Sequence, residues 1–138
     1  MTAMTDGVHR LALRVYYEDT DAGGIVYHTA YLRFAERGRT EYLRATGFDH
    51  QNLRRETGAG FVVRHIAVDY RRAAYLDDEL VVTTRVVETS GASARMEQQV
   101  LRDGVPLVSL SVQLAFLGDD GRPKRLPGDL RQAFLSQT

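Results

Sequence analysis

The hydrophobic pattern of the chain begins with a period of two and then changes to the period of a helix. Apolar side chains occupy alternate positions near the N-terminus: Leu11, Leu13, Val15 and Tyr17. This alternation predicts a half-buried strand over residues 10–17, with the Tyr17 ring on the core side. From Thr29, a residue type favoured at helix N-caps, the apolar spacing becomes three and four residues.

The second pattern predicts one long amphipathic helix. Its apolar face carries Tyr31, Phe34, Ala35, Gly38, Tyr42 and Ala45. Gly47 follows the last of these residues and is well placed to end the helix. Because glycine costs about 1 kcal/mol relative to alanine in a helix interior, Gly38 indicates a close approach of another backbone element. On the polar face, Glu36 and Arg39 are spaced to form an ion pair.

For the remainder of the chain, the pattern predicts a short helix over 49–56, four strands and a loose terminal helix over 129–135. The strands are expected at 61–71, 80–86, 94–102 and 108–116, and Asp103-Gly104 is a strong hairpin signal. An antiparallel sheet with one apolar face must be covered, and the long helix is the only sizeable candidate. The sequence therefore predicts an α+β fold. Residues 10–138 are expected to form one domain, preceded by a disordered tail over residues 1–9.

Composition excludes several classes of function. With 18 basic and 18 acidic side chains the formal charge is zero, so no global field or basic stripe recruits nucleic acid. The absence of cysteine removes disulfides, thiolate catalysis and cysteine-based zinc sites. No apolar run has the length of a signal core or a membrane span, which predicts a cytoplasmic protein with no integral membrane segment.

Candidate chemistry is concentrated in the loop from Tyr16 to His28, between the predicted strand and the long helix. Asp21 is the strongest candidate, as a general base or a nucleophile at an acyl carbonyl. The alternative is a turn aspartate that caps its own loop before Gly23 and Gly24. Asp19 fits that turn role better, because Asp21 lies nearer the two glycines.

The start of the predicted helix supplies a second element. Its first backbone amides lack intrahelical acceptors and can form an oxyanion hole facing Asp21. His28 could transfer a proton or orient substrate or water, or it could only form hydrogen bonds at the helix terminus. The Tyr17 hydroxyl is expected to turn toward this loop.

Other readings of the same residues are weaker. The spacing of Asp19 and Asp21 resembles the start of a calcium loop, but Ala30 stands where the bidentate glutamate belongs. Three candidate ligands in one loop are weak support for a metal site, and none is predicted. Three arginines near one strand, Arg64, Arg71 and Arg72, could bind phosphates, although solvent-exposed arginine is the simpler interpretation of each.

The run Asp21-x-x-Gly24-x-Val26-Tyr27-His28 resembles the corresponding motif of the hotdog-fold acyl-CoA thioesterases. The closest likeness is to the 4-hydroxybenzoyl-CoA thioesterase family, in its Tol–Pal-associated branch. It continues through Phe61-Val62-Val63-Arg64 and Tyr75-Leu76-Asp77-Asp78, and spans residues 10–126.

This resemblance implies a hotdog fold, in which five or six antiparallel strands wrap the helix, and homodimers that pair into homotetramers. It implies that Asp21 is the catalytic carboxylate, that the backbone amide of His28 polarises the thioester carbonyl, and that Tyr17 lies beside the site. Substrate binding would fall to Gly24, Val26, Tyr27 and Arg64. Arg64 is a substitute, because residues 90–93 lack the positive charge that binds the coenzyme A phosphates in some relatives.

The activity implied is hydrolysis of acyl-CoA thioesters, with no cofactor beyond the coenzyme A of the substrate. A peripheral position at the inner membrane fits the same branch. Two alternatives stay open. One is a hotdog hydratase or dehydratase, whose histidine and acidic residue are differently spaced. The other is a non-catalytic module that binds acyl-CoA or an envelope complex.

Overall fold

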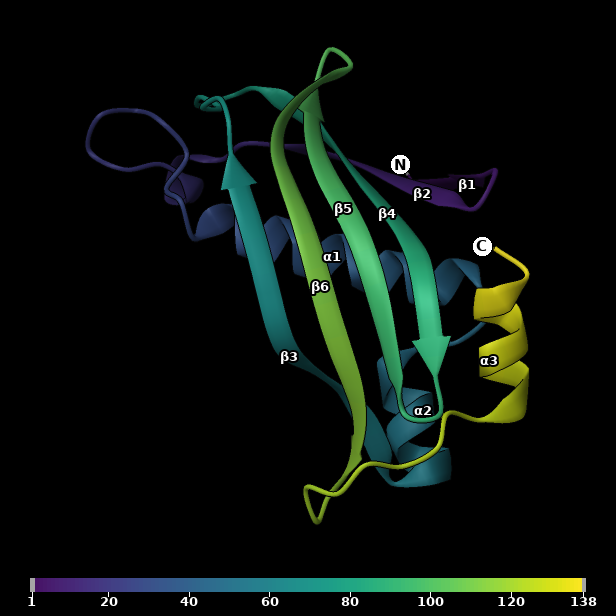
Figure 1. The fold of residues 1–138 in the computed structure, drawn as a ribbon. Helices are drawn as coiled ribbons and strands as arrows, with labels where there is room; N and C mark the ends of the chain where they lie inside the picture. Colours follow the sequence, from purple (N-terminus) through teal and green to yellow (C-terminus); the bar gives the residue numbers. More distant parts are fainter. Residues whose placement is uncertain (1, 138) are drawn as a thin grey trace.

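A six-stranded antiparallel sheet curves around one long helix in the computed structural model, which describes residues 2–137 (Figure 1). The strand order is β1-β2-β4-β5-β6-β3, so β1 and β3 form the two edges. The strands are β1 (Thr2–Thr5), β2 (Val8–Arg14), β3 (Ala59–Tyr70), β4 (Glu79–Ser90), β5 (Ser93–Arg102) and β6 (Val105–Gly118). The helices are α1 (Ala30–Ala45), α2 (His50–Thr57) and α3 (Gly128–Leu135), with one 3₁₀ turn, η1 (Tyr17–Asp19).

Helix α1 packs its apolar face on the inner face of the sheet, which confirms the predicted α+β hotdog arrangement. Gly38 lies tightly against the sheet, because a Cβ there would lie 2.8 Å from a Val82 methyl and 2.9 Å from the Thr84 hydroxyl. Two positions differ from the expected face. Ala45 is exposed, and Arg39, assigned to the polar face, is only 8% exposed.

The strand register follows the turn residues and one irregularity. Asp103 and Gly104 both have positive φ, 52° and 78°, as the tight β5–β6 hairpin requires. The β3–β6 pairing slips between Val63 and His65, so Arg64 lies at a β-bulge on an edge strand. The bulge leaves the Arg64 side chain exposed.

The structure corrects the expectation for the N-terminal segment. Residues 2–9, expected to be a disordered tail, contain β1 and the start of β2 in an antiparallel hairpin. His9, in the β2 strand of this hairpin, is 0% exposed. The predicted strand also ends early, because β2 stops at Arg14, and Tyr17 is 81% exposed on η1 instead of lying in the core.

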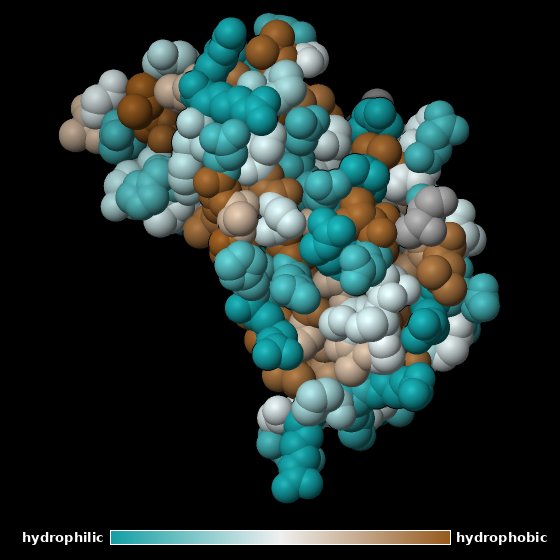
Figure 2. All heavy atoms as spheres, viewed as in Figure 1, coloured by the Kyte–Doolittle hydropathy of each residue, from teal (hydrophilic) through white to brown (hydrophobic). Residues whose placement is uncertain are grey.

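The outer face of the sheet mixes polar and apolar side chains (Figure 2). Helices α2 and α3 lie near one end of α1 (Figure 1). None of the helices within residues 2–137 combines the length and apolar character needed to cross a membrane.

Candidate active site

The loop between β2 and α1 is tied to the segment that precedes β4. The Val15 amide donates to the Asp78 carbonyl oxygen, and the Val26 amide donates to the Ala74 carbonyl oxygen, both at 2.9 Å. The Leu76 amide donates to the Gly24 carbonyl oxygen at 3.4 Å. These bonds hold the loop at the end of the sheet where β3 finishes and β4 begins.

Asp19 fixes the shape of this loop from inside. Its buried carboxylate accepts a 2.9 Å hydrogen bond from the Tyr16 amide and lies 3.7 Å from an Arg33 guanidinium nitrogen. Its carbonyl oxygen accepts from the Tyr27 amide at 2.8 Å. Asp19 therefore has the structural turn role that the sequence indicated.

Asp21 is exposed at the tip of the same loop. One carboxylate oxygen, Oδ1, accepts a hydrogen bond from the Gly23 amide at 2.8 Å, which is the local turn contact expected of an aspartate before glycine. The Gly24 backbone has a φ of 82°, a value that favours glycine. Oδ2 of Asp21 accepts no hydrogen bond from any residue in 2–137, so the turn contact leaves it available for chemistry.

The start of α1 presents unused backbone donors. The Ala30 amide bonds to the Tyr27 carbonyl oxygen at 2.8 Å, and the Leu32 amide bonds to the Thr29 carbonyl oxygen at 3.1 Å. Within the described chain, the amides of His28 and Thr29 donate to no acceptor. Such a pair of amides at a helix start suits an oxyanion.

Tyr70, the last residue of β3, braces this helix start. Its hydroxyl donates a 2.8 Å hydrogen bond to the His28 carbonyl oxygen. Its ring meets those of His28 and Tyr31 edge to face, with centroids 6.4 and 5.8 Å away. Tyr31 is itself buried, and its hydroxyl accepts from the Ala74 amide; burial raises the pKa of Tyr31.

These elements surround a cleft of about 390 Å³. Its lining residues are Asp21, Ile25, Val26, Tyr27, His28, Tyr31, Tyr70, Arg71, Arg72 and Ala73. The cleft thus brings together Asp21, Val26, Tyr27 and His28 from the predicted set. Tyr17, Gly24 and Arg64 do not line it.

Sequence reasoning missed the contribution of Tyr70 to this site. The polar hydroxyl at the end of an apolar strand was a weak signal, and only the strand order places it next to α1. The positions of Arg71 and Arg72 in the sequence allow them to bind phosphates, but their spacing does not indicate that they line the same cleft as Asp21.

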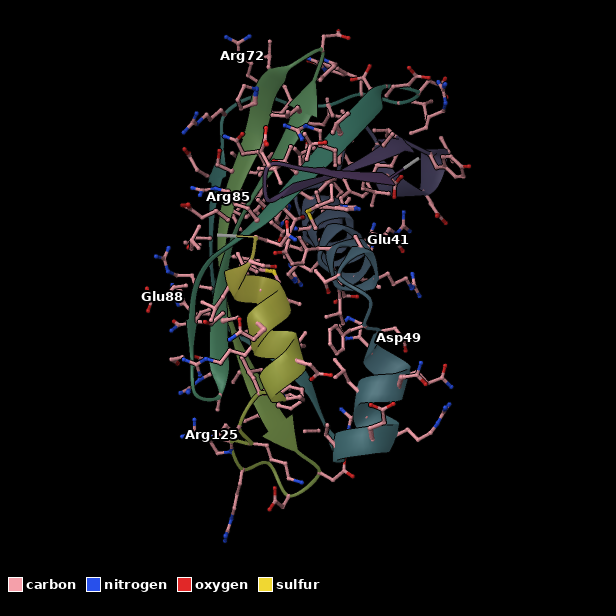
Figure 3. All side chains as sticks on the ribbon, turned by 90° about the vertical axis from the view of Figure 1, so that its right-hand side faces the viewer. Glu41, Asp49, Arg72, Arg85, Glu88 and Arg125 are labelled. Carbon is pink, nitrogen blue, oxygen red and sulfur yellow. The ribbon has the colours of Figure 1, made fainter. Side chains whose placement is uncertain are left out.

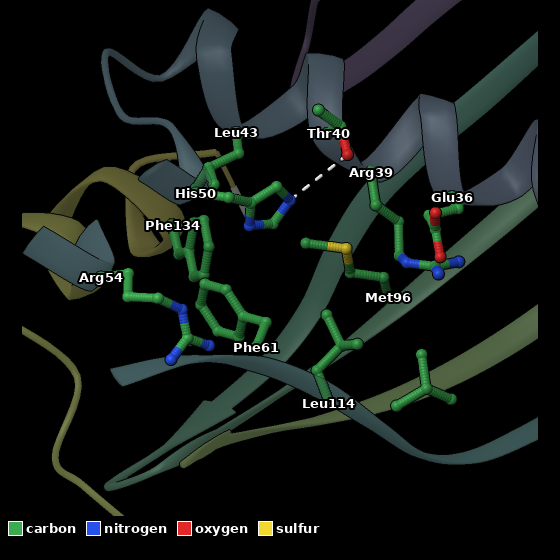
Figure 4. Close-up of a pocket in the computed structure, with 12 residues that line it drawn as sticks. Glu36, Arg39, Thr40, Leu43, His50, Arg54, Phe61, Met96, Leu114 and Phe134 are labelled. Atoms are coloured by element: carbon green, nitrogen blue, oxygen red, sulfur yellow. Dashed lines mark hydrogen bonds between the residues drawn. The ribbon is translucent and has the colours of Figure 1, made fainter. Parts of the chain in front are cut away.

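A second cavity, of about 300 Å³, lies between α1, α2 and the sheet (Figure 4). Its apolar lining includes Leu43, Phe61, Met96, Leu114 and Phe134, and its polar lining includes Glu36, Arg39, His50 and Arg54. Burial lowers the pKa of Arg39 and of His50. Arg39 donates to Gln98 at 3.0 Å, and over the described residues it forms no direct ion pair with Glu36, contrary to the predicted pairing.

No cluster of three histidine, aspartate or glutamate side chains that could hold a metal ion occurs in the described part of the chain. The arrangement places a carboxylate with one unbonded oxygen, on Asp21, in the same cleft as His28, whose backbone amide is unused within the described chain. These groups can activate a nucleophile and stabilise an oxyanion within one cleft.

Comparison with known proteins agrees with this geometry. The family model of the thioesterase-like superfamily matches residues 15–134. The acyl-CoA thioesterase YbgC of Haemophilus influenzae is 46% identical over 133 residues, covering 95% of this chain and 97% of that protein.

Two solved structures are similar as well. A probable thioesterase from Bartonella henselae has a TM-score of 0.83 and 42% identity, covering 87% of this chain and 99% of its own. A thioesterase from Thermus thermophilus, described as complexed with coenzyme A and zinc, has a TM-score of 0.80 and 30% identity. The match covers 93% of this chain and 92% of that protein's chain.

The chain belongs to the thioesterase-like superfamily of hotdog proteins. Its similarity to YbgC extends over nearly the whole length of both proteins, which confirms the branch predicted from the Asp21–His28 motif.

Proposed function

We propose that this protein hydrolyses acyl-CoA thioesters to a free acid and coenzyme A. The observation that carries the proposal is that Asp21 lines the same cleft as His28, whose backbone amide donates to no acceptor within the described chain. Support comes from the relatives, since the YbgC protein of Haemophilus influenzae bears the name acyl-CoA thioesterase. The Thermus thermophilus thioesterase is described with coenzyme A bound.

In the reaction, the thioester carbonyl oxygen would point toward the amides at the start of α1. As a nucleophile adds to the carbonyl carbon, the C=O π electrons move to that oxygen, and the amides stabilise the resulting charge. The tetrahedral intermediate then collapses, the C–S bond breaks, and the coenzyme A thiolate leaves and takes up a proton.

Asp21 can act in either of two ways. As a general base it removes a proton from water, and the hydroxide adds to the carbonyl carbon. As a nucleophile its oxygen attacks directly, giving an acyl anhydride that water then hydrolyses. Both routes consume one water and yield the same products. The side chain of His28 orients water or substrate, and Tyr27 and Val26 contact the substrate.

Release of free thiol from a panel of short, long and aromatic acyl-CoAs tests this function. The wild-type protein should release thiol from at least one member, and Asp21→Asn should not. An enoyl-CoA in the panel tests the hydratase alternative, because hydration consumes the double bond without releasing thiol. Binding of acyl-CoA with no turnover of any member would instead indicate a non-catalytic binding module.

The proposed assembly is a homodimer, which pairs into a dimer of dimers. Its support is the free outer edge of β3, which no other strand among residues 2–137 covers (Figure 1). Val62 and Val63 are exposed on that strand, at 45% and 41%. Sedimentation velocity tests the assembly: a species of monomer mass at all concentrations would exclude it.

A further inference from the structure

Two consecutive arginines follow the last residue of β3 and line the same cleft as Asp21 and His28. The backbone amides of Arg71 and Arg72 both donate to the Leu107 carbonyl oxygen, at 2.9 and 3.1 Å. The neighbouring Tyr70 holds the His28 carbonyl oxygen. The backbone from which both guanidinium groups extend is therefore fixed relative to the loop that carries Asp21.

The two side chains differ in their partners. The Arg71 Nε atom donates to the Asp69 carboxylate at 2.9 Å. Within residues 2–137, Arg72 forms neither an ion pair nor a side-chain hydrogen bond. Figure 3 shows Arg72 at the end of the sheet, extending away from it. Arg14 and Arg85, two other exposed arginines on the sheet, are paired with carboxylates.

An unpaired guanidinium on the rim of a thioesterase cleft suits a specific part of the substrate. Coenzyme A carries its acyl group on sulfur at one end of a long flexible arm and its phosphates at the other end. The binding group for the phosphates must then lie at the rim and not beside the reacting carbonyl. Arginine presents a planar fork of donors that matches phosphate oxygens in a bidentate geometry.

We propose that Arg72, assisted by Arg71, binds the phosphate groups of coenzyme A. This inference rests on the proposed thioesterase function and deepens it by naming where the carrier part of the substrate is held. It also replaces Arg64 in that role, since Arg64 lies at the bulge in β3 and does not line the cleft.

The test compares two thioesters with the same acyl group, one on coenzyme A and one on N-acetylcysteamine, which has no phosphate. Arg72→Gln should raise KM for the acyl-CoA by about tenfold, because a charge-assisted contact is lost, and should leave kcat unchanged. The double variant, which adds Arg71→Gln, should raise KM for the acyl-CoA further. Kinetics on the N-acetylcysteamine thioester should not change. Arg125→Gln is the matched control, because Arg125 is exposed at the opposite end of the sheet (Figure 3).

An unchanged KM for acyl-CoA in Arg72→Gln, or an equal rise for both substrates, would overturn the inference while the hydrolytic function stands. If the wild-type protein hydrolyses neither thioester, the proposed function fails. The phosphate site is then decided by calorimetric binding of coenzyme A itself. A tenfold weaker affinity in Arg72→Gln supports the site, and equal affinity or no binding by the wild-type protein rejects it.

Discussion

The Tyr70 hydroxyl donates a 2.8 Å hydrogen bond to the backbone carbonyl oxygen of His28, a residue 42 positions earlier in the chain. This bond joins the end of the edge strand β3 to His28, which lines the cleft shortly before the start of α1. The two rings also meet edge to face. Tyr70 is therefore a positioning residue for the proposed oxyanion hole, and it acts through the backbone of His28.

Tyr70→Phe should lower kcat by about fivefold, since one ordinary hydrogen bond contributes about 1 kcal/mol and the helix start loses its brace. The KM should change less than kcat. Tyr75→Phe is the matched control, because Tyr75 is also half-exposed, its backbone pairs with that of the cleft residue Ile25, and its ring contact with Arg102 survives the change. Steady-state kinetics on one acyl-CoA would decide: equal kcat in Tyr70→Phe and wild type would exclude the positioning role.

The two aspartates of the loop should separate into a structural one and a chemical one. Asp19→Ala removes a buried acceptor of the Tyr16 amide, and should lower the free energy of unfolding by about 1–3 kcal/mol. Asp21→Asn keeps an oxygen that can accept from the Gly23 amide, so its stability should equal that of the wild type. Urea denaturation of both variants measures the difference. Equal losses would mean that the roles are not separate.

Gly38→Ala should destabilise the protein although alanine is the better helix former. The added Cβ would lie within 3.0 Å of side-chain atoms of Val82, Thr84 and Gln98, and overpacking of this kind costs about 1–3 kcal/mol. This cost outweighs the gain of about 1 kcal/mol in helix propensity. Thermal unfolding should show a lower Tm for Gly38→Ala and little change for Arg37→Ala on the exposed face of α1. A higher Tm for Gly38→Ala would contradict this, and would show that the side chains of the sheet shift to accommodate the added Cβ.

Stability should fall between about pH 7.5 and pH 5 because of two histidines. Burial lowers the pKa of His9, outweighing the nearby Glu41, and burial likewise lowers the pKa of His50. A histidine with a lowered pKa binds its proton more readily in the unfolded chain. The stability that neutral His9 and His50 provide is therefore complete above the unfolded pKa of about 6.5 and is lost as the pH falls below it.

Urea unfolding at the two pH values measures this loss. His9→Leu should reduce the pH dependence, because it removes one titrating group from the core. His65→Gln, on an exposed strand position, should leave it unchanged. A pH dependence in His9→Leu equal to that of the wild type would assign the effect to other groups.

Much of the fold follows from periodicity. The face of α1 and the alternation of β6 were readable because each buries a regular set of positions: Val108, Leu110, Val112, Leu114 and Phe116 are all buried. The N-terminal hairpin was missed although Asp6-Gly7 is the same turn signal as Asp103-Gly104. The two turns share positive φ values, 52° and 75° in one and 52° and 78° in the other.

The sequence predicts only part of the candidate site. The residues from Asp21 to His28 are contiguous, so their motif revealed them. Tyr70 and Arg72 reach the cleft only because β3 is the sheet edge next to the start of α1. The order of strands in a sheet cannot be predicted from the local sequence. The alternation of apolar residues continues past Arg14 and so predicts Tyr17 in the core, but the strand itself ends at Arg14.

The most direct test of the account is the ratio of kcat/KM for acyl-CoA hydrolysis between Asp21→Asn and wild type, with Glu18→Gln as the control for an exposed carboxylate in the same loop. Loss of a catalytic carboxylate should reduce kcat/KM by about a hundredfold or more, and Glu18→Gln should remain within twofold of wild type. A loss of only a few-fold in Asp21→Asn would contradict the central role given to Asp21.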